Sequence, residues 1–138
     1  MTVLKELALS VTWRRTLRFF WVLAILIVIV GSLLPGNSTP IRMLDRLEIS
    51  DKLQHFGAYA VLAALPAIHE RRKFLIAAAI LAVVLGVGLE FGQLASPGRD
   101  FEVGDMLADA SGVCFGLMIG IPLRTRKLVR ALLYDSTK

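Results

Sequence analysis

Four apolar segments, each close to the length that crosses a bilayer, constrain the fold of this chain most strongly. They cover about residues 16–34, 51–68, 74–95 and 103–121, and a transmembrane helix needs roughly 20 residues. Hydrophobic residues make up 56% of the 138-residue chain and the mean hydropathy is +0.67, which exceeds the usage of soluble domains. We therefore expect an all-α integral membrane bundle of four transmembrane helices, forming a single domain over residues 1–138.

The second segment is the most polar of the four, because it contains Asp51, Lys52, Gln54, His55 and Pro66. Ionisable residues inside a membrane segment are costly and indicate a functional site by default. Two structures are open for this segment, a full crossing and a re-entrant or interfacial segment. We predict the full crossing.

The basic residues are distributed unevenly between the two sides that four crossings would create. One side, with both termini and the loop 69–73, holds 12 of the 16 Lys and Arg residues; the other holds Arg42, Arg46, Lys52 and Arg99. Basic loops stay in the cytoplasm. The sequence thus predicts a multi-pass protein of the inner (plasma) membrane with both termini cytoplasmic.

The excess of positive charge beside apolar segments indicates contact with anionic lipid rather than with nucleic acid, which we do not expect as a partner. Residues 1–15 and 124–134 mix leucines with basic residues. This composition is typical of short amphipathic helices at a membrane surface. Membrane lipid is therefore an expected partner, and the sequence leaves the oligomeric state open.

Polar residues recur at helical spacing near the extracytoplasmic end of three segments. The recurring sets are Asp51, His55 and Tyr59, then Glu90 and Gln93, then Asp105 and Asp109. Spacings of three or four residues place side chains on one helix face. Because lipid cannot solvate these groups, they should face one another inside the bundle. We predict a ligand-binding site made of Asp51, Lys52, His55, Tyr59, Glu90, Gln93, Arg99, Asp105 and Asp109.

The same residues allow several roles. His55, Glu90 and Asp105 are the candidate catalytic residues; His55 suits a proton shuttle, general base, metal ligand or structural hydrogen bond. Glu90 suits acid–base work or an ion pair with Arg99. Asp105 and Asp109 could ligate a cation with Glu90 and His55, or Asp105 could cap its helix. We expect no cofactor and no metal, since no His or Cys spacing typical of a metal site is present.

A glycine ridge accompanies the acidic residues of the fourth segment. Gly112, Gly116 and Gly120 share the face of Asp105 and Asp109. Small residues at every fourth position allow two membrane helices to pack closely. Candidate partners in the third segment are Gly86 and Gly88.

Three short motifs together resemble the VanZ-like family. They are Asp51-Lys52-x-x-His55-Phe56-x-x-Tyr59, Glu90-x-x-Gln93, and Gly98-Arg99 followed by Asp105 and Gly112. Where that family usually has Asn before the glycine of the fourth helix, this chain has Asp109. The resemblance implies a small multi-span envelope protein, and a link to resistance against the glycopeptide antibiotic teicoplanin.

Three functions remain open from the sequence. The first is a protein that binds an amphiphile, such as a lipid-linked glycan or a glycopeptide, with Lys52, Arg99 and the acids holding the headgroup. The second is a membrane hydrolase or transferase acting on a lipid-linked phosphate or ester, with His55 or Glu90 as base and Arg99 as anion clamp. The third is a structural or partner-binding subunit whose polar residues hold the helices together.

Overall fold

The computed structural model describes the backbone of residues 2–135 and the side chains of residues 12–44 and 46–124. This part of the chain is helical with connecting turns. The helices are α1 (Thr2–Leu33), α2 (Thr39–Asp45), α3 (Asp51–His69), α4 (Arg72–Gln93) and α5 (Val103–Asp135). The expected all-α class is confirmed for the described residues.

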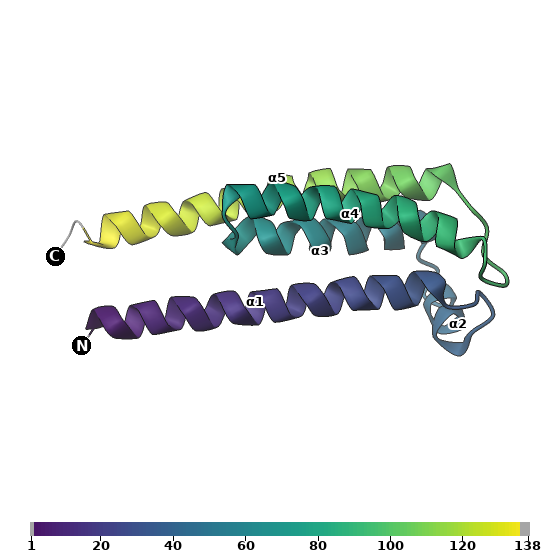
Figure 1. Cartoon of the computed structure of the whole chain (residues 1–138), viewed down its shortest axis with the longest axis horizontal. Coiled ribbons are helices and arrows are strands. Elements are labelled where there is room, and N and C mark those ends of the chain that lie inside the picture. The colour runs from purple at the N-terminus through teal and green to yellow at the C-terminus, as the bar shows by residue number, and fades with distance from the viewer. Residues whose placement is uncertain (1, 136–138) are drawn as a thin grey trace.

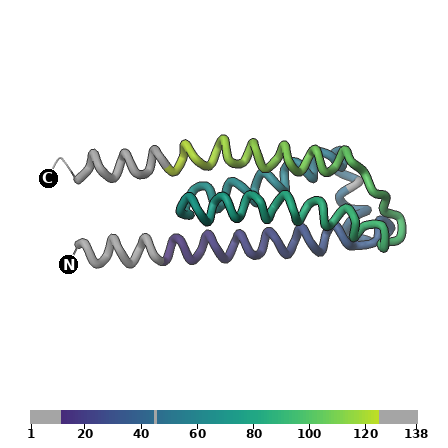
Figure 2. Tube along the Cα trace, turned by 45° about the horizontal axis from the view of Figure 1, so that its top comes forward, coloured from purple at the N-terminus to yellow at the C-terminus, as the bar shows by residue number. Residues whose placement is uncertain are grey.

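The four long helices run alternately up and down (Figures 1 and 2), so that α2 and the loop between α4 and α5 lie at one end. We call this the α2 end. The α3–α4 turn lies towards the opposite end of the bundle. Three helices contain stretches long and apolar enough to cross a membrane, Thr12–Leu33, Arg72–Gln93 and Val103–Arg124. The chain is therefore a helical membrane protein. Helix α3 is not one of these three candidate spans, because its sequence is more polar.

The helix bounds differ from the sequence expectation in three places. The loop 35–50 contains α2, which has Pro40 in its first turn, a favourable position for proline. Helix α5 continues through Pro122 instead of ending there, since membrane helices tolerate an internal proline. The segments 1–15 and 124–134 were expected as separate surface helices, but residues 2–15 belong to α1 and residues 124–134 to α5. Residue 1 and the side chains of 2–11 and 125–134 lie outside the described residues.

Helix α3 packs more extensively on α5 than on any other helix. The glycine ridge of α5 makes this possible, because a Cβ at Gly112 or Gly116 would collide with the α3 backbone at Phe56 or Ala60, and one at Gly120 would lie 2.5 Å from the Cβ of Ala67. The predicted close-packing face is confirmed. Its predicted partner is wrong: the ridge packs on α3 rather than on Gly86 and Gly88 of α4.

A proline and a tryptophan join α3 to α1. Pro66 has no N–H, so the carbonyl of Leu62 four residues earlier lacks its normal helical donor. The indole Nε1 of Trp21 donates to that oxygen at 2.9 Å. The tertiary contact thus supplies the hydrogen bond that the helix cannot make.

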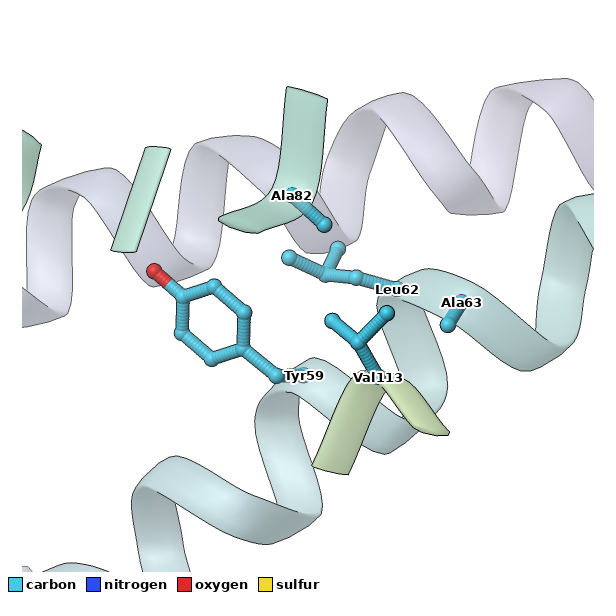
Figure 3. Close-up of a cluster of buried hydrophobic side chains, with 5 residues drawn as sticks. All are labelled: Tyr59, Leu62, Ala63, Ala82 and Val113. Carbon is cyan, nitrogen blue, oxygen red and sulfur yellow. The ribbon is translucent and has the colours of Figure 1, made fainter. Parts of the chain in front are cut away.

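The buried core is small and lies between α3, α4 and α5. Figure 3 shows its members, Tyr59, Leu62, Ala63, Ala82 and Val113. Many large apolar side chains point outward instead, including Phe19 and Ile27 of α1, Val84 of α4 and Met118 of α5. Such a surface requires an apolar solvent, as a lipid-embedded bundle does.

Candidate functional site

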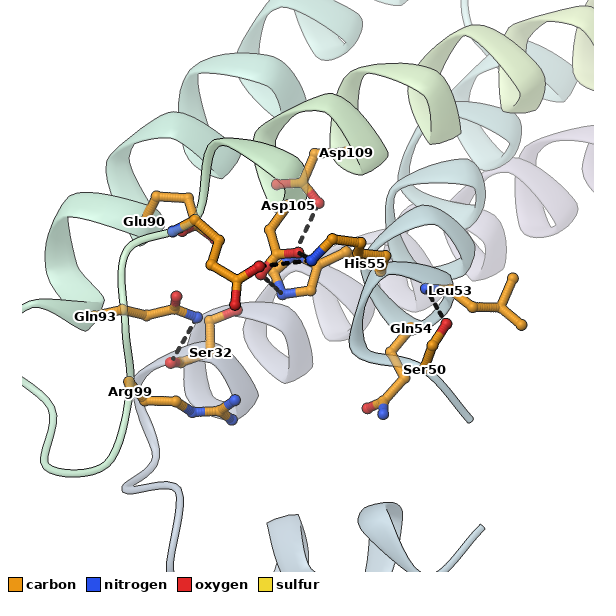
Figure 4. Close-up of polar contacts among 12 residues, drawn as sticks. Ser32, Ser50, Leu53, Gln54, His55, Glu90, Gln93, Arg99, Asp105 and Asp109 are labelled. Atoms are coloured by element: carbon orange, nitrogen blue, oxygen red, sulfur yellow. Dashed lines mark hydrogen bonds and ion pairs between the residues drawn. The ribbon is translucent and has the colours of Figure 1, made fainter. Parts of the chain in front are cut away.

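His55 of α3 lies between two carboxylates of α5 (Figure 4). Its Nδ1 is 3.0 Å from Asp109 Oδ1 and its Nε2 is 3.9 Å from Asp105 Oδ2. When Asp109 is ionised its carboxylate only accepts hydrogen bonds; in that state Nδ1 carries the proton and Nε2 is the nitrogen that can exchange one. The i, i+4 spacing of the two aspartates places both opposite one turn of α3.

Lys52 extends this contact to the loop before α5. Its Nζ lies 2.6 Å from Glu102 Oε2 and 3.3 Å from Asp105 Oδ1. The ammonium group lowers the pKa of the Glu102 carboxyl, mainly through this hydrogen bond. The backbone N–H of Glu102 in turn donates to Glu90 Oε2 at 3.1 Å. We call Lys52, His55, Glu90, Glu102, Asp105 and Asp109 the polar cluster.

Two carboxylate oxygens of the polar cluster are buried without a hydrogen-bond partner, Glu90 Oε1 and Asp109 Oδ2. Glu90 is 1% exposed and Asp109 is 2% exposed. The oxygen of Asp109 is directed at Gly86 of α4, where a Cβ would lie 2.5 Å from it. A buried acceptor without a donor is destabilising, so an added proton or donor group at either oxygen would lower the energy.

A cavity of about 240 Å³ lies beside the polar cluster, between α1, α2 and α3. Its polar lining includes Asp51, His55, Tyr59, Gln93 and Arg99. Its apolar lining includes Ile27, Val28, Ile41 and Leu44. One wall is therefore suited to a polar group and the other to a hydrocarbon.

Asp51 lines the same cavity from the start of α3. Ser50 is the N-cap of α3, accepting the backbone N–H of Leu53, and Asp51 occupies the first turn. The helix dipole favours a carboxylate at this position.

The last residue of α4 and the loop that follows it hold the end of α1. Arg99 donates to the carbonyls of Leu34 and Gly31, each at 3.3 Å, and Gln93 Nε2 donates to Ser32 O at 3.3 Å. The last carbonyls of a helix lack partners within it, so these side chains act as a cap. Within the described side chains, Arg99 forms no ion pair with Glu90, contrary to the pairing that the sequence suggested.

Three ligand atoms are close enough together for a cation. One atom each from Asp51, His55 and Asp105 lie within 4.8 Å of one another. This set differs from the sequence hypothesis, which used Glu90 and Asp109. Lys52 already neutralises Asp105 from one side, which disfavours a second positive charge at the same oxygen.

The nine predicted residues are thus grouped, but not all in one contact network. Lys52, His55, Glu90, Asp105 and Asp109 belong to the polar cluster, whereas Asp51, Tyr59, Gln93 and Arg99 line the cavity beside it. The sequence prediction omitted Glu102, which connects Lys52 to Glu90. In the sequence, Glu102 could have been indicated only by its position directly before the helix that carries Asp105.

A second polar group at the α3–α4 turn was also missed. The Glu70 carboxylate binds Arg18 through two hydrogen bonds of 2.5 and 3.1 Å, and Arg14 lies 3.6 Å away. Arg18 lowers the pKa of Glu70, chiefly by these hydrogen bonds. His69 is not simply a loop residue, because it ends α3 and places Nε2 3.3 Å from Glu70.

Comparison with known proteins gives one family match. A family model described as VanZ/LLP1 matches residues 9–124, which is most of the chain. No curated protein and no solved structure matches. The matched range includes every residue of the polar cluster and of the cavity lining.

Proposed function

The chain belongs to the VanZ/LLP1 family, and from this membership and the cavity we propose that it binds an amphiphilic ligand at the α2 end of the bundle. The ligand class is a lipid-linked glycan or a glycopeptide carrying an acyl chain, and a link to teicoplanin-type resistance belongs to this proposal. The cavity supports the proposal most directly, because it has a polar wall beside the polar cluster and an apolar wall on α1 and α2.

The proposed setting is the plasma membrane, with four crossings and both termini in the cytoplasm. The uneven distribution of basic residues supports this orientation. The fourth crossing is α3, which lies alongside α5 and joins α2 to the start of α4. If α1, α4 and α5 cross, then α3 connects opposite surfaces. The cavity then opens towards the extracytoplasmic leaflet, where such ligands are presented.

The size of the cavity limits what it holds. Ligand cavities are usually roughly 300–1,000 Å³, so a volume of about 240 Å³ accepts one part of a large amphiphile. The polar wall offers Arg99 and the Tyr59 hydroxyl as donors, and Asp51 and His55 as acceptors. This combination suits a glycan or peptide headgroup with both donors and acceptors.

The decisive experiment fills the cavity without changing the polar cluster. Ala58→Leu places a larger side chain on its α3 wall, and Val61→Leu on the exposed side of α3 is the matched control. Binding of teicoplanin, and of the same glycopeptide without its acyl chain, is measured on the purified protein in lipid nanodiscs. We expect Ala58→Leu to weaken binding of the acylated ligand at least tenfold, which is about 1.4 kcal/mol. An equal affinity of both variants would contradict the proposal.

One geometric feature favours a second function, that of a membrane hydrolase or transferase. A histidine oriented by a carboxylate through Nδ1, with Nε2 available, is the arrangement of a general base. Turnover of a lipid-linked phosphate or ester by the purified protein, lost in His55→Ala, would establish an enzyme. Binding that persists in His55→Ala with no turnover in either protein would leave the binding function alone.

A further inference from the structure

A basic cavity lies at the α3–α4 turn, away from the polar cluster. It has a volume of about 310 Å³ and is lined by Arg14, Arg15, Arg18, Arg71 and Phe74. Four guanidinium groups from α1 and from the turn thus surround one space. Their density of positive charge makes this cavity suitable for an anion.

The charge of this cavity is only partly neutralised inside the protein. Glu70 pairs with Arg18 and, at 3.6 Å, with Arg14. The backbone oxygen of Glu70 also accepts a hydrogen bond from Arg124. Among the described side chains, no carboxylate lies within ion-pair distance of Arg15 or Arg71. Two arginines therefore remain to bind an external negative group.

An apolar groove of about 410 Å³ continues from the basic cavity. Its apolar lining comes from Trp21 and Val22 of α1, Pro66 of α3, and Ala77 and Leu81 of α4. Glu70, which is paired with Arg18, also lines it. Arg18 and Phe74 line both the cavity and the groove, so the two spaces adjoin. The result is a cationic space followed by a narrow apolar one.

We propose that these two adjoining spaces together bind one anionic phospholipid, with the phosphate among the arginines and an acyl chain in the apolar groove. The order of the two spaces matches the order of chemistry along a phospholipid. With the termini in the cytoplasm, the headgroup lies at the cytoplasmic leaflet, where the surface is anionic. The site is separate from the cavity at the α2 end and does not depend on the ligand proposed there.

The arginines, rather than the groove, should determine which lipid binds. An acyl chain leaves one apolar solvent for another when it enters the groove, so it gains packing but little hydrophobic transfer energy. Each basic residue near the surface contributes about a fivefold increase in affinity for an anionic headgroup. Loss of Arg15 and Arg71 together should thus weaken binding on the order of 25-fold.

The test uses the full chain in detergent and native mass spectrometry. The probes are phosphatidylglycerol and phosphatidylcholine with identical acyl chains. We expect the first to bind at least tenfold more tightly, and the variant Arg15→Gln/Arg71→Gln to lose this preference. Arg42→Gln/Arg46→Gln, at exposed positions of the α2 end, is the control and should keep it. Equal binding of both lipids by the wild type, or equal loss in the control, would overturn the proposal.

Two further measurements separate a lipid from a free phosphate. Glycerol phosphate at millimolar concentration should not displace phosphatidylglycerol, because it cannot use the groove. Ala77→Phe should lower the affinity for phosphatidylglycerol several-fold, whereas Val84→Phe on the exposed part of α4 should leave it unchanged. Displacement by glycerol phosphate, or an Ala77→Phe variant with wild-type affinity, would show that the acyl chain is not bound there.

Discussion

Glu70 is the residue at which several parts of the chain meet at the α3–α4 turn. Its side chain binds Arg18 and Arg14 of α1, and its backbone oxygen accepts from Arg124 of α5. One residue thus fixes the spacing of three helices. Because the side chain is only 10% exposed, these contacts are partly shielded from solvent screening.

The lowered pKa of Glu70 predicts how stability responds to acid. Arg18 holds this pKa below the ordinary value of 4.5, so the contact contributes fully above that value and is lost as the pH falls through the folded-state pKa. Glu70→Gln should lower the thermal midpoint at neutral pH and make it less sensitive to acid. Thermal unfolding of the purified protein across the acid range measures both effects.

Glu48→Gln is the matched control, since Glu48 is an exposed acid in the loop before α3. It should keep the acid sensitivity of the wild type. A Glu70→Gln variant with the same midpoint and the same acid sensitivity as the wild type would show that the Glu70 contacts contribute nothing to stability.

At the scale of helices, the contact between α1 and α3 depends on a defect in α3. Pro66 leaves the Leu62 carbonyl without a helical donor, and Trp21 supplies one at 2.9 Å. Trp21→Phe should therefore leave a buried carbonyl unpaired and lower the free energy of unfolding by about 1–3 kcal/mol. Unfolding in a denaturing detergent measures this loss.

A double-mutant cycle separates the hydrogen bond from the packing of the ring. Pro66→Ala restores an N–H four residues after Leu62, so Trp21→Phe should cost less in that background than in the wild type. A coupling of roughly 0.5–3 kcal/mol is expected for residues that share one partner. Strict additivity of the two substitutions would argue that the indole N–H contributes nothing.

Helical spacing alone was enough to predict which polar side chains of the candidate site lie close together. Asp105 and Asp109 fall on the ridge of α5, and His55 falls on the facing side of α3, because the period of a helix fixes which side chains share a face. The close packing of Gly112 and Gly116 was predictable for the same reason, although their partner helix was not. Which two helices touch depends on the tertiary arrangement, which spacing does not encode.

The residues in loops were predicted least well. Arg99 has the chemistry of an anion clamp, yet in the structure it donates to the end of α1. The path of the loop decides this, and that path depends on Gly98 with φ of 73° and on the close approach of Gly36. Glu102 and Glu70 were missed for a related reason, since their partners are about 50 residues away in sequence.

At the scale of the whole molecule, the proposed orientation predicts which loops face outward. In a Cys114→Ser background, Asn37→Cys and Asp100→Cys lie in exposed positions at the α2 end, and Arg72→Cys lies at the start of α4. The first two should react with a membrane-impermeant maleimide in intact cells. Arg72→Cys should react only after permeabilisation.

The same experiment discriminates between the two structures open for the second segment. A re-entrant α3 would place Arg72 on the same surface as Asn37, and both cysteines would then react in intact cells. That outcome would contradict four crossings, whereas protection of Arg72→Cys requires α3 to span the membrane.

The pairing of α3 with α5 has a consequence for how the protein is synthesised. Helix α3 is too polar to qualify as a crossing by itself, and the groups that contact His55 and Lys52 reside on α5 and just before it. The ribosome produces α5 only after α4, a delay of a few seconds at roughly 5–20 residues per second. During that interval α3 has no partner for its charges, so if α3 is the proposed fourth crossing, its insertion becomes stable only after α5 has been made.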